Sequence, residues 1–232
     1  MAEGAVVIVG GTSGLGRRLA QVFAGEGGPV VITGREAARS EAVAREIGGD
    51  TRGVALDLAE PGGIGTRLDG VGTVDHVVLA AIERDSNSVR EYDVERALRL
   101  ATLKLVGYTE VLHRLHPRMH DETSVLLFGG LAKDRPYPGS TTVTSVNGAV
   151  TTMVRTFATE LAPIRVNALH PGIVGDSPTW AGATEMLDNV KARTPTGRLI
   201  TMEEVTDAAL FLLRNRAVNG VNLAVDGGWM ML

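Results

Sequence analysis

The sequence predicts an α/β fold in which helices cover both faces of a doubly wound parallel sheet of about seven strands. Short β-branched runs alternate along the chain with longer segments of helical periodicity, which is typical of parallel strand–helix–strand units. A glycine-rich turn joins the first strand to the first helix. The 232 residues contain no internal repeat and no linker, so we expect residues 1–232 to form one domain.

The elements follow from these patterns in chain order. The apolar run at 4–9 is the first expected strand, and the glycines after it open a helix over 14–26. Later strands are expected where β-branched and apolar residues form short runs, at 29–33, 52–56, 74–80, 123–129, 164–169 and 220–225. Later helices are expected where apolar residues recur every three or four positions, at 36–47, 89–100, 102–116, 140–162 and 203–214.

Residues 176–200 form the least regular part of the chain. They are rich in Pro, Thr and Gly around a short helical candidate at 183–192. Ligands of open parallel sheets bind beyond the carboxyl ends of the strands, and this late segment follows such an end. We therefore expect residues 176–200 to act as a lid on the substrate side.

The composition argues against several classes of function. The formal net charge is −4 and no basic run occurs, so we expect no nucleic-acid partner. The absence of cysteine excludes disulfides, thiolate catalysis and cysteine–zinc sites. Apolar stretches such as 77–82 are too short to cross a membrane, and the first strand begins too near Met1 to leave room for a signal peptide. We expect a cytoplasmic protein without a membrane partner.

The turn after the first strand has the composition of a pyrophosphate seat. Glycines let the backbone turn sharply and approach the phosphates. The unpaired N–H groups at the start of the next helix, together with the helix dipole, favour an anion. We expect this seat to be formed by Gly10, Thr12, Ser13, Gly14, Leu15 and Gly16.

Further motifs follow the glycine turn in order, and together they resemble the short-chain dehydrogenase/reductase family over nearly the whole chain. They are Val31-Ile32-Thr33-Gly34-Arg35, Ala55-Leu56-Asp57-Leu58, Asp75-His76-Val77-Val78, Gly107 with Pro117 and Met119, Ile164-Arg165-Val166-Asn167-Ala168 with Pro171-Gly172, and Val225-Asp226-Gly227-Gly228. The resemblance implies a Rossmann-type fold that binds a nicotinamide dinucleotide. It also implies an oxidoreductase that acts on a small carbonyl or alcohol.

Residue 35 indicates which cofactor form is bound. NAD-selective members of the family usually end the second strand with a carboxylate that accepts a hydrogen bond from the ribose 2′-hydroxyl. Here that position is Gly34, and the guanidinium of Arg35 follows it and can bind a 2′-phosphate bidentately. We therefore expect NADP(H), the alternative being that Arg35 is only an exposed surface residue. Arg17 and Arg18 are weaker candidates for the same phosphate.

The resemblance implies further cofactor contacts. Asp57 corresponds to the residue whose side chain meets the adenine amino group, although it could instead cap the segment that follows it. The other positions expected to contact the cofactor are Leu58, Ala80, Ala81, Asn147, Pro171, Gly172 and Val174.

The proton-handling residues of the family are missing from this chain. The family's tyrosine, lysine, serine and asparagine positions are occupied here by Val143, Asn147, Gly130 and Lys104. Valine cannot protonate an alkoxide, and general acid–base catalysis contributes ~10²–10⁴-fold to rate. Two classes of function therefore stay open. One is an NADP-dependent oxidoreductase with a non-standard proton route, and the other is a non-redox protein on the same scaffold, such as a cyclase, isomerase, dehydratase or cofactor-binding regulatory subunit.

The catalytic residues are thus unknown from the sequence, with three candidates. Lys104 stands where the family has an amide, and Asn147 stands where it has an ammonium. One hypothesis is that Lys104 reaches across so that charge and amide still share one pocket, with Asn147 holding the nicotinamide ribose. The alternative is two independent changes that leave Lys104 solvated on a helix face. Tyr137 could carry a proton, or its ring could simply pack between two prolines.

Three histidines are candidate metal ligands. His113, His116 and His120 would share one face of a helix, but Pro117 interrupts that helix. No cysteine or glutamate completes a ligand set, so we expect no metal site.

The sequence also favours self-association. The family pairs its subunits through helices that correspond to 102–116 and 140–162, and the second has apolar residues on more than one face. The tail from Val225 ends in an apolar Trp-Met-Met-Leu run. We expect a homodimer or homotetramer, the alternative being that these residues pack on their own core.

Overall fold

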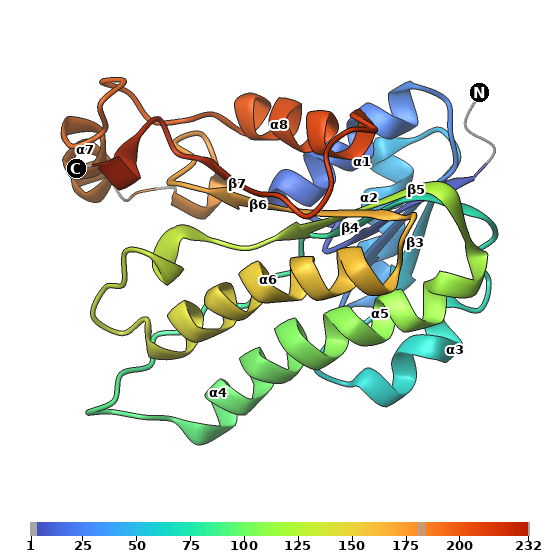
Figure 1. The fold of residues 1–232 in the computed structure, drawn as a ribbon, viewed down its shortest axis with the longest axis horizontal. Coiled ribbons are helices and arrows are strands. Elements are labelled where there is room, and N and C mark those ends of the chain that lie inside the picture. The colour runs from blue at the N-terminus through green and yellow to red at the C-terminus, as the bar shows by residue number, and fades with distance from the viewer. Residues whose placement is uncertain (1–3, 181, 183, 232) are drawn as a thin grey trace.

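A computed structural model describes residues 4–180, 182 and 184–231 (Figure 1). Within these ranges seven parallel strands form one sheet in the order β3-β2-β1-β4-β5-β6-β7. The strands are β1 (Ala5–Val9), β2 (Val30–Gly34), β3 (Thr51–Ala55), β4 (Val74–Leu79), β5 (Met119–Phe128), β6 (Arg165–Pro171) and β7 (Asn222–Val225). The doubly wound fold expected from the sequence is confirmed.

Helices cover both faces of the sheet, as Figure 1 shows. One face carries α1 (Gly14–Gly25), α2 (Ala37–Ile47) and α8 (Met202–Arg214), and the other carries α3 (Ile64–Leu68), α4 (Val94–Ala101), α5 (Tyr108–Leu115) and α6 (Thr141–Glu160). Successive side chains of a strand point to opposite faces. In β1, Val7 and Val9 therefore pack toward α5 and α6, whereas Val6 and Ile8 pack toward α1 and α8.

One long helical segment replaces the two helices expected at 89–100 and 102–116. It begins at Val94 because Asp93 caps it, accepting a hydrogen bond from the backbone N–H of Arg96 at 3.1 Å. Residues 89–93 belong instead to a loop that the Asn87 side chain holds through the backbone of Asp93. Thr102–Gly107 is a π-helical turn that joins α4 to α5 without a break. Such turns occur frequently at functional sites.

Two further differences have simple causes. β5 begins at Met119, whereas the sequence predicts its start at residue 123. The residues before 123 are mostly polar and exposed, so no apolar run marks the true start of the strand. The short helix α3 was not expected, and it buries Ile64 and Leu68 against the sheet.

The candidate lid contains a 3-10 turn (Pro178–Trp180) and α7 (Thr184–Ala192). Residue 183 of the expected helix, like 181 beside it, lies outside the described residues. No helix within the described ranges is long and apolar enough to cross a membrane.

Candidate functional site

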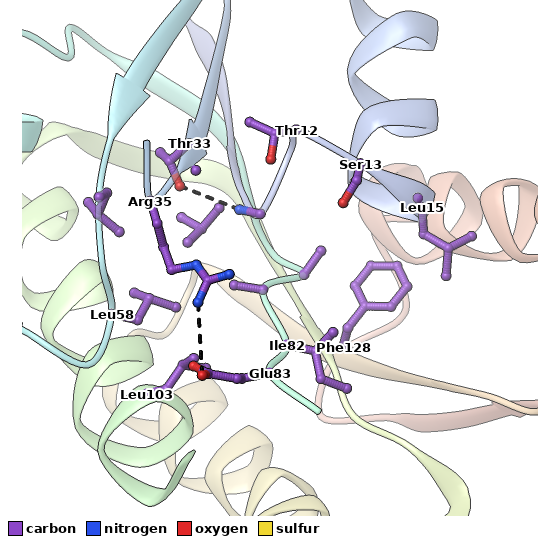
Figure 2. A pocket seen from close by; sticks show the side chains of 18 of the residues that line it. Thr12, Ser13, Leu15, Thr33, Arg35, Leu58, Ile82, Glu83, Leu103 and Phe128 are labelled. Carbon is purple, nitrogen blue, oxygen red and sulfur yellow. Dashed lines mark hydrogen bonds and ion pairs between the residues drawn. The ribbon is translucent and has the colours of Figure 1, made fainter. Parts of the chain in front are cut away.

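A cavity of about 350 Å³ opens beyond the carboxyl ends of the strands (Figure 2). Each of β1 to β6 ends at it, since its walls come from the segments that directly follow those strands. Twelve of the expected cofactor residues line it, namely Gly10, Thr12, Ser13, Gly14, Leu15, Gly16, Arg35, Asp57, Leu58, Ala80, Ala81 and Pro171. Asn147, Gly172 and Val174 do not line it.

The glycine turn is shaped by close backbone contacts. Gly10 has a φ of +88°, and a β-carbon there would lie 2.6 Å from the backbone nitrogen of Ala81. Its N–H donates to the backbone oxygen of Thr33 at 3.2 Å and lies 3.4 Å from Oγ1 of the same residue (Figure 2). At Gly16 a β-carbon would lie 2.4 Å from the backbone oxygen of Gly10. Both positions therefore require glycine.

The N-terminus of α1 is suited to binding an anion. Ser13 occupies the N-cap position, but its side chain makes no capping hydrogen bond, and the first turn holds no acidic residue. The first N–H groups of a helix have no partner within the helix, and the helix dipole adds positive potential there. These groups and the turn before them face the cavity, so they fit a dinucleotide pyrophosphate.

Arg35 enters the cavity from the end of β2. Its side chain is 64% exposed, and Nη1 lies 3.9 Å from Oε1 of Glu83 across the cavity (Figure 2). Arg39, on the first turn of α2, also lines the cavity and was missed by the sequence analysis. By contrast, Arg17 and Arg18 lie outside the cavity, where each is 2.7 Å from a surface glutamate.

Asp57 is held by two groups. Oδ1 accepts a hydrogen bond from the backbone N–H of Ala59 at 2.9 Å, which closes a local turn, whereas the N-cap of the short helical turn Pro61–Gly63 is Glu60. Oδ2 accepts from Nη2 of Arg99 at 2.9 Å, and Arg99 also pairs with Glu83. Partial burial raises the pKa of Asp57, but the bonds from Ala59 and Arg99 outweigh it and hold this pKa below its ordinary value. Asp57 therefore stays ionised beside the cavity at neutral pH.

Lys104 lines the cavity and is only 1% exposed, so the interpretation of a solvated Lys104 is wrong. Its Nζ donates to Oη of Tyr108 at 2.7 Å and to the backbone oxygen of Phe128 at 2.8 Å. Tyr108 donates in turn to the backbone oxygen of Ala81 at 2.7 Å. Burial lowers the pKa of Lys104 to about 7 and raises the pKa of Tyr108. Tyr108 was not among the site residues expected from the sequence, although its spacing of four residues from Lys104 on one helix was a usable signal.

Asn147 fills the space that a side chain at residue 130 would need. It is 4% exposed, and a β-carbon at Gly130 would lie 2.8 Å from its Nδ2. The family's serine position and lysine position are therefore adjacent in space, and the changes at the two are sterically compatible with each other. Since Asn147 does not line the cavity, the geometry gives no support to the hypothesis that it shares a pocket with Lys104.

Tyr137 and the histidines lie elsewhere. The Tyr137 side chain is 54% exposed and borders a separate surface cavity with Val89 and Pro136. His120 lies at the start of β5, where Nε2 is 2.8 Å from Oδ1 of Asp75. In the described ranges, no group of three or more His, Cys, Asp or Glu residues could hold a metal ion.

Known proteins resemble this chain over almost its whole length. A family model described as enoyl-(acyl carrier protein) reductase matches residues 9–230. The NADP-dependent (R)-specific alcohol dehydrogenase of Lentilactobacillus kefiri is 29% identical over 240 residues, which cover 96% of this chain and 95% of the relative.

Two solved structures show the same fold. One, described as a short chain dehydrogenase/reductase family protein, has a TM-score of 0.88 and 30% identity, and the match covers 99% of this chain and 98% of that one. The MalC reductase/Diels-Alderase of Malbranchea aurantiaca has a TM-score of 0.90 and 25% identity, with 98% and 96% covered. Because the glycine turn, the sheet order and these matches all agree, the chain belongs to the short-chain dehydrogenase/reductase family.

Proposed function

We propose that the protein binds NADP(H) in this cavity and acts as an oxidoreductase on a small carbonyl or alcohol, by a proton route other than the family's tyrosine and lysine. The observation that carries the proposal is the pair of guanidiniums, Arg35 and Arg39, beside the glycine turn, where β2 ends in a glycine rather than a carboxylate. Guanidiniums bind a 2′-phosphate well, whereas a carboxylate would repel it. One relative is itself described as NADP-dependent.

Different residues of the cavity contact different parts of the cofactor. The N–H groups of the glycine turn and α1 hold the pyrophosphate, and Asp57 receives the adenine amino group. Pro171, at the end of β6, supports the nicotinamide end of the cofactor. When bound, the cofactor supplies a hydride. The chain supplies orientation, exclusion of water and the proton.

A non-redox function is the second candidate. It is favoured by the replacement of all four proton-handling positions, at Val143, Asn147, Gly130 and Lys104. A related solved structure is described as both a reductase and a Diels-Alderase, so its description already joins redox and non-redox chemistry on this fold. In that case the cavity would serve as a shaped pocket or a cofactor sensor.

Cofactor titration followed by an absorbance assay tests the proposal. We expect NADPH to bind more tightly than NADH in calorimetry, because only NADPH carries the 2′-phosphate. We then expect NADPH absorbance to fall in the presence of at least one member of a broad panel of aldehydes and ketones. Tight NADPH binding without consumption across the panel would favour the non-redox alternative. Absence of heat with either nucleotide would contradict cofactor binding altogether.

We also propose that the protein forms a homodimer, or a homotetramer that contains this dimer, through the outer face of α4 and α5. Val94, Leu98 and Val106 on this face are 57%, 62% and 50% exposed, which is unusual for clustered aliphatic residues. Val94 and Leu98 border a groove that is closed on its other side by α6. The tail, by contrast, packs on its own chain, with the Arg135 guanidinium 4.3 Å from the centre of the Trp229 ring. Residue 232 lies outside the described residues.

Leu98→Glu is expected to shift the protein to monomers, because it places a charge at the centre of this apolar face. Sedimentation equilibrium measures the change in mass. Phe211→Glu is the matched control, since Phe211 is 50% exposed on α8, across the sheet from α4. A monomeric wild type, or the same response to both variants, would contradict the proposed interface.

A further inference from the structure

Lys104 differs from the other lysines of this protein. The chain has three lysines, and Lys104 alone is buried, whereas Lys133 is partly accessible and Lys191 is exposed. Burying an ammonium removes its hydration, which costs free energy unless an opposite charge or hydrogen bonds compensate for the loss. Packing alone therefore does not explain why Lys104 is buried.

The contacts of Lys104 do not neutralise its charge. Its two hydrogen-bond partners, the Tyr108 hydroxyl and the Phe128 carbonyl, are neutral oxygens. Asp57 and Glu83, which also line the cavity, are paired with Arg99. No carboxylate among the described residues forms an ion pair with Lys104. An ammonium has three N–H donors, so these two bonds leave one donor for another acceptor.

The order of the strands places Lys104 at the nicotinamide end of the cavity. Arg35 follows β2, and the pyrophosphate seat follows β1. Lys104 is bonded to the last residue of β5 and, through Tyr108, to the segment after β4. In the sheet, β4 and β5 lie on the opposite side of β1 from β2. A dinucleotide whose pyrophosphate rests on the central turn, with its adenosine phosphate at Arg35, therefore extends its nicotinamide toward Lys104.

We propose that Lys104 is the proton carrier of this site, held in place by Tyr108 and the Phe128 carbonyl; this inference rests on the proposed function. As a hydride reaches the carbonyl carbon, the C=O π pair moves to oxygen, and that oxygen takes a proton from Nζ. The product is an alcohol, and Lys104 is left as a neutral amine that recovers its proton from solvent. In the direction of oxidation, the neutral amine accepts the alcohol proton.

The charge state of Lys104 suits this role. Its pKa of about 7 leaves both the ammonium and the amine populated at neutral pH, which favours proton transfer in either direction. The oxidised nicotinamide ring carries a positive charge that the reduced ring lacks. A nearby ammonium should therefore lose its proton more readily when NADP⁺ is bound than when NADPH is bound.

Calorimetry in two buffers of different ionisation enthalpy measures this difference without requiring a substrate. At pH 7 we expect wild-type protein to release roughly 0.4 proton more on binding NADP⁺ than on binding NADPH, which corresponds to lowering a pKa of 7 by about one unit. Phosphate contacts cancel in the comparison, because both forms carry the same phosphates. Lys104→Met should abolish the difference, and the control Lys191→Met should retain it.

Lysine-selective ¹³C NMR of the wild type gives a second measurement that does not depend on how Lys104→Met folds. One of the three lysine signals should titrate near neutral pH, and its midpoint should be lower with NADP⁺ than with NADPH. Equal proton exchange and equal midpoints, with both nucleotides bound, would overturn the role of Lys104 and leave cofactor binding intact. Absence of binding by either nucleotide would overturn both.

Discussion

Replacing Arg35 with glutamate is expected to weaken NADPH binding by about a hundredfold or more. The change removes charge-assisted hydrogen bonds worth ~1.5–3 kcal/mol and adds repulsion between the new carboxylate and the 2′-phosphate. NADH lacks that phosphate, and the carboxylate can accept a hydrogen bond from its 2′-hydroxyl, so NADH affinity should hold or rise. Calorimetric titration of both nucleotides at one ionic strength measures the change in preference, because salt screens such contacts.

The present environment of Arg35 supports this expectation. Its contact with Glu83 is 3.9 Å long and largely exposed, so it contributes little and should yield to a bound phosphate. Arg45→Glu is the matched control, since Arg45 is an exposed arginine of α2 that does not line the cavity. An equal loss of NADPH and NADH binding in Arg35→Glu would indicate general damage. Unchanged NADPH binding would place the 2′-phosphate elsewhere.

Restoring the family's serine by Gly130→Ser is expected to lower the free energy of unfolding by about 1–3 kcal/mol. Gly130 has a φ of −174°, an extended conformation that any residue adopts, so the backbone contributes no strain. The cost comes from the Asn147 amide, whose Nδ2 lies 2.8 Å from the site of the new β-carbon. Because Asn147 is buried, its amide has little room to move away. Urea denaturation measures the loss.

A double-mutant cycle identifies Asn147 as the cause. Adding Asn147→Ala should recover most of the stability lost in Gly130→Ser, with a coupling of about 1 kcal/mol or more. Gly148→Ser serves as the control, since a β-carbon there meets nothing within 4 Å. A stable Gly130→Ser protein, or additive effects of the two changes, would refute the steric link between the serine and lysine positions.

Local chemistry explains why most of the fold could be predicted. Parallel strands that are buried on both faces appear in the sequence as apolar, β-branched runs. β1 is such a strand, since every one of its residues is buried. The glycine turn was equally clear, because only glycine fits the contacts of Gly10 and Gly16. The errors arose where polar residues form regular structure. The exposed start of β5 shows no apolar pattern, and the Asp93 cap moved the start of α4 away from residue 89.

The candidate site was predictable only in part. Arg35 and the glycine turn follow strands directly, so their place at one edge of the sheet was expected from the order of the elements. Arg99 is far along the chain from Asp57, and only packing brings their side chains to 2.9 Å. The burial of Lys104 depends on a π-helical turn and on the end of β5, which no local pattern reveals.

By itself, the sequence determined the family, the parallel sheet, the glycine turn after β1 and the replacement of the family's usual proton donors, since each depends on residues close together in the chain. The tertiary structure alone decided which side chains face one another, because those contacts join segments that only packing brings together. It placed Lys104 against Tyr108 and Phe128 in a buried position, and it placed the Asn147 amide where a serine side chain would otherwise lie.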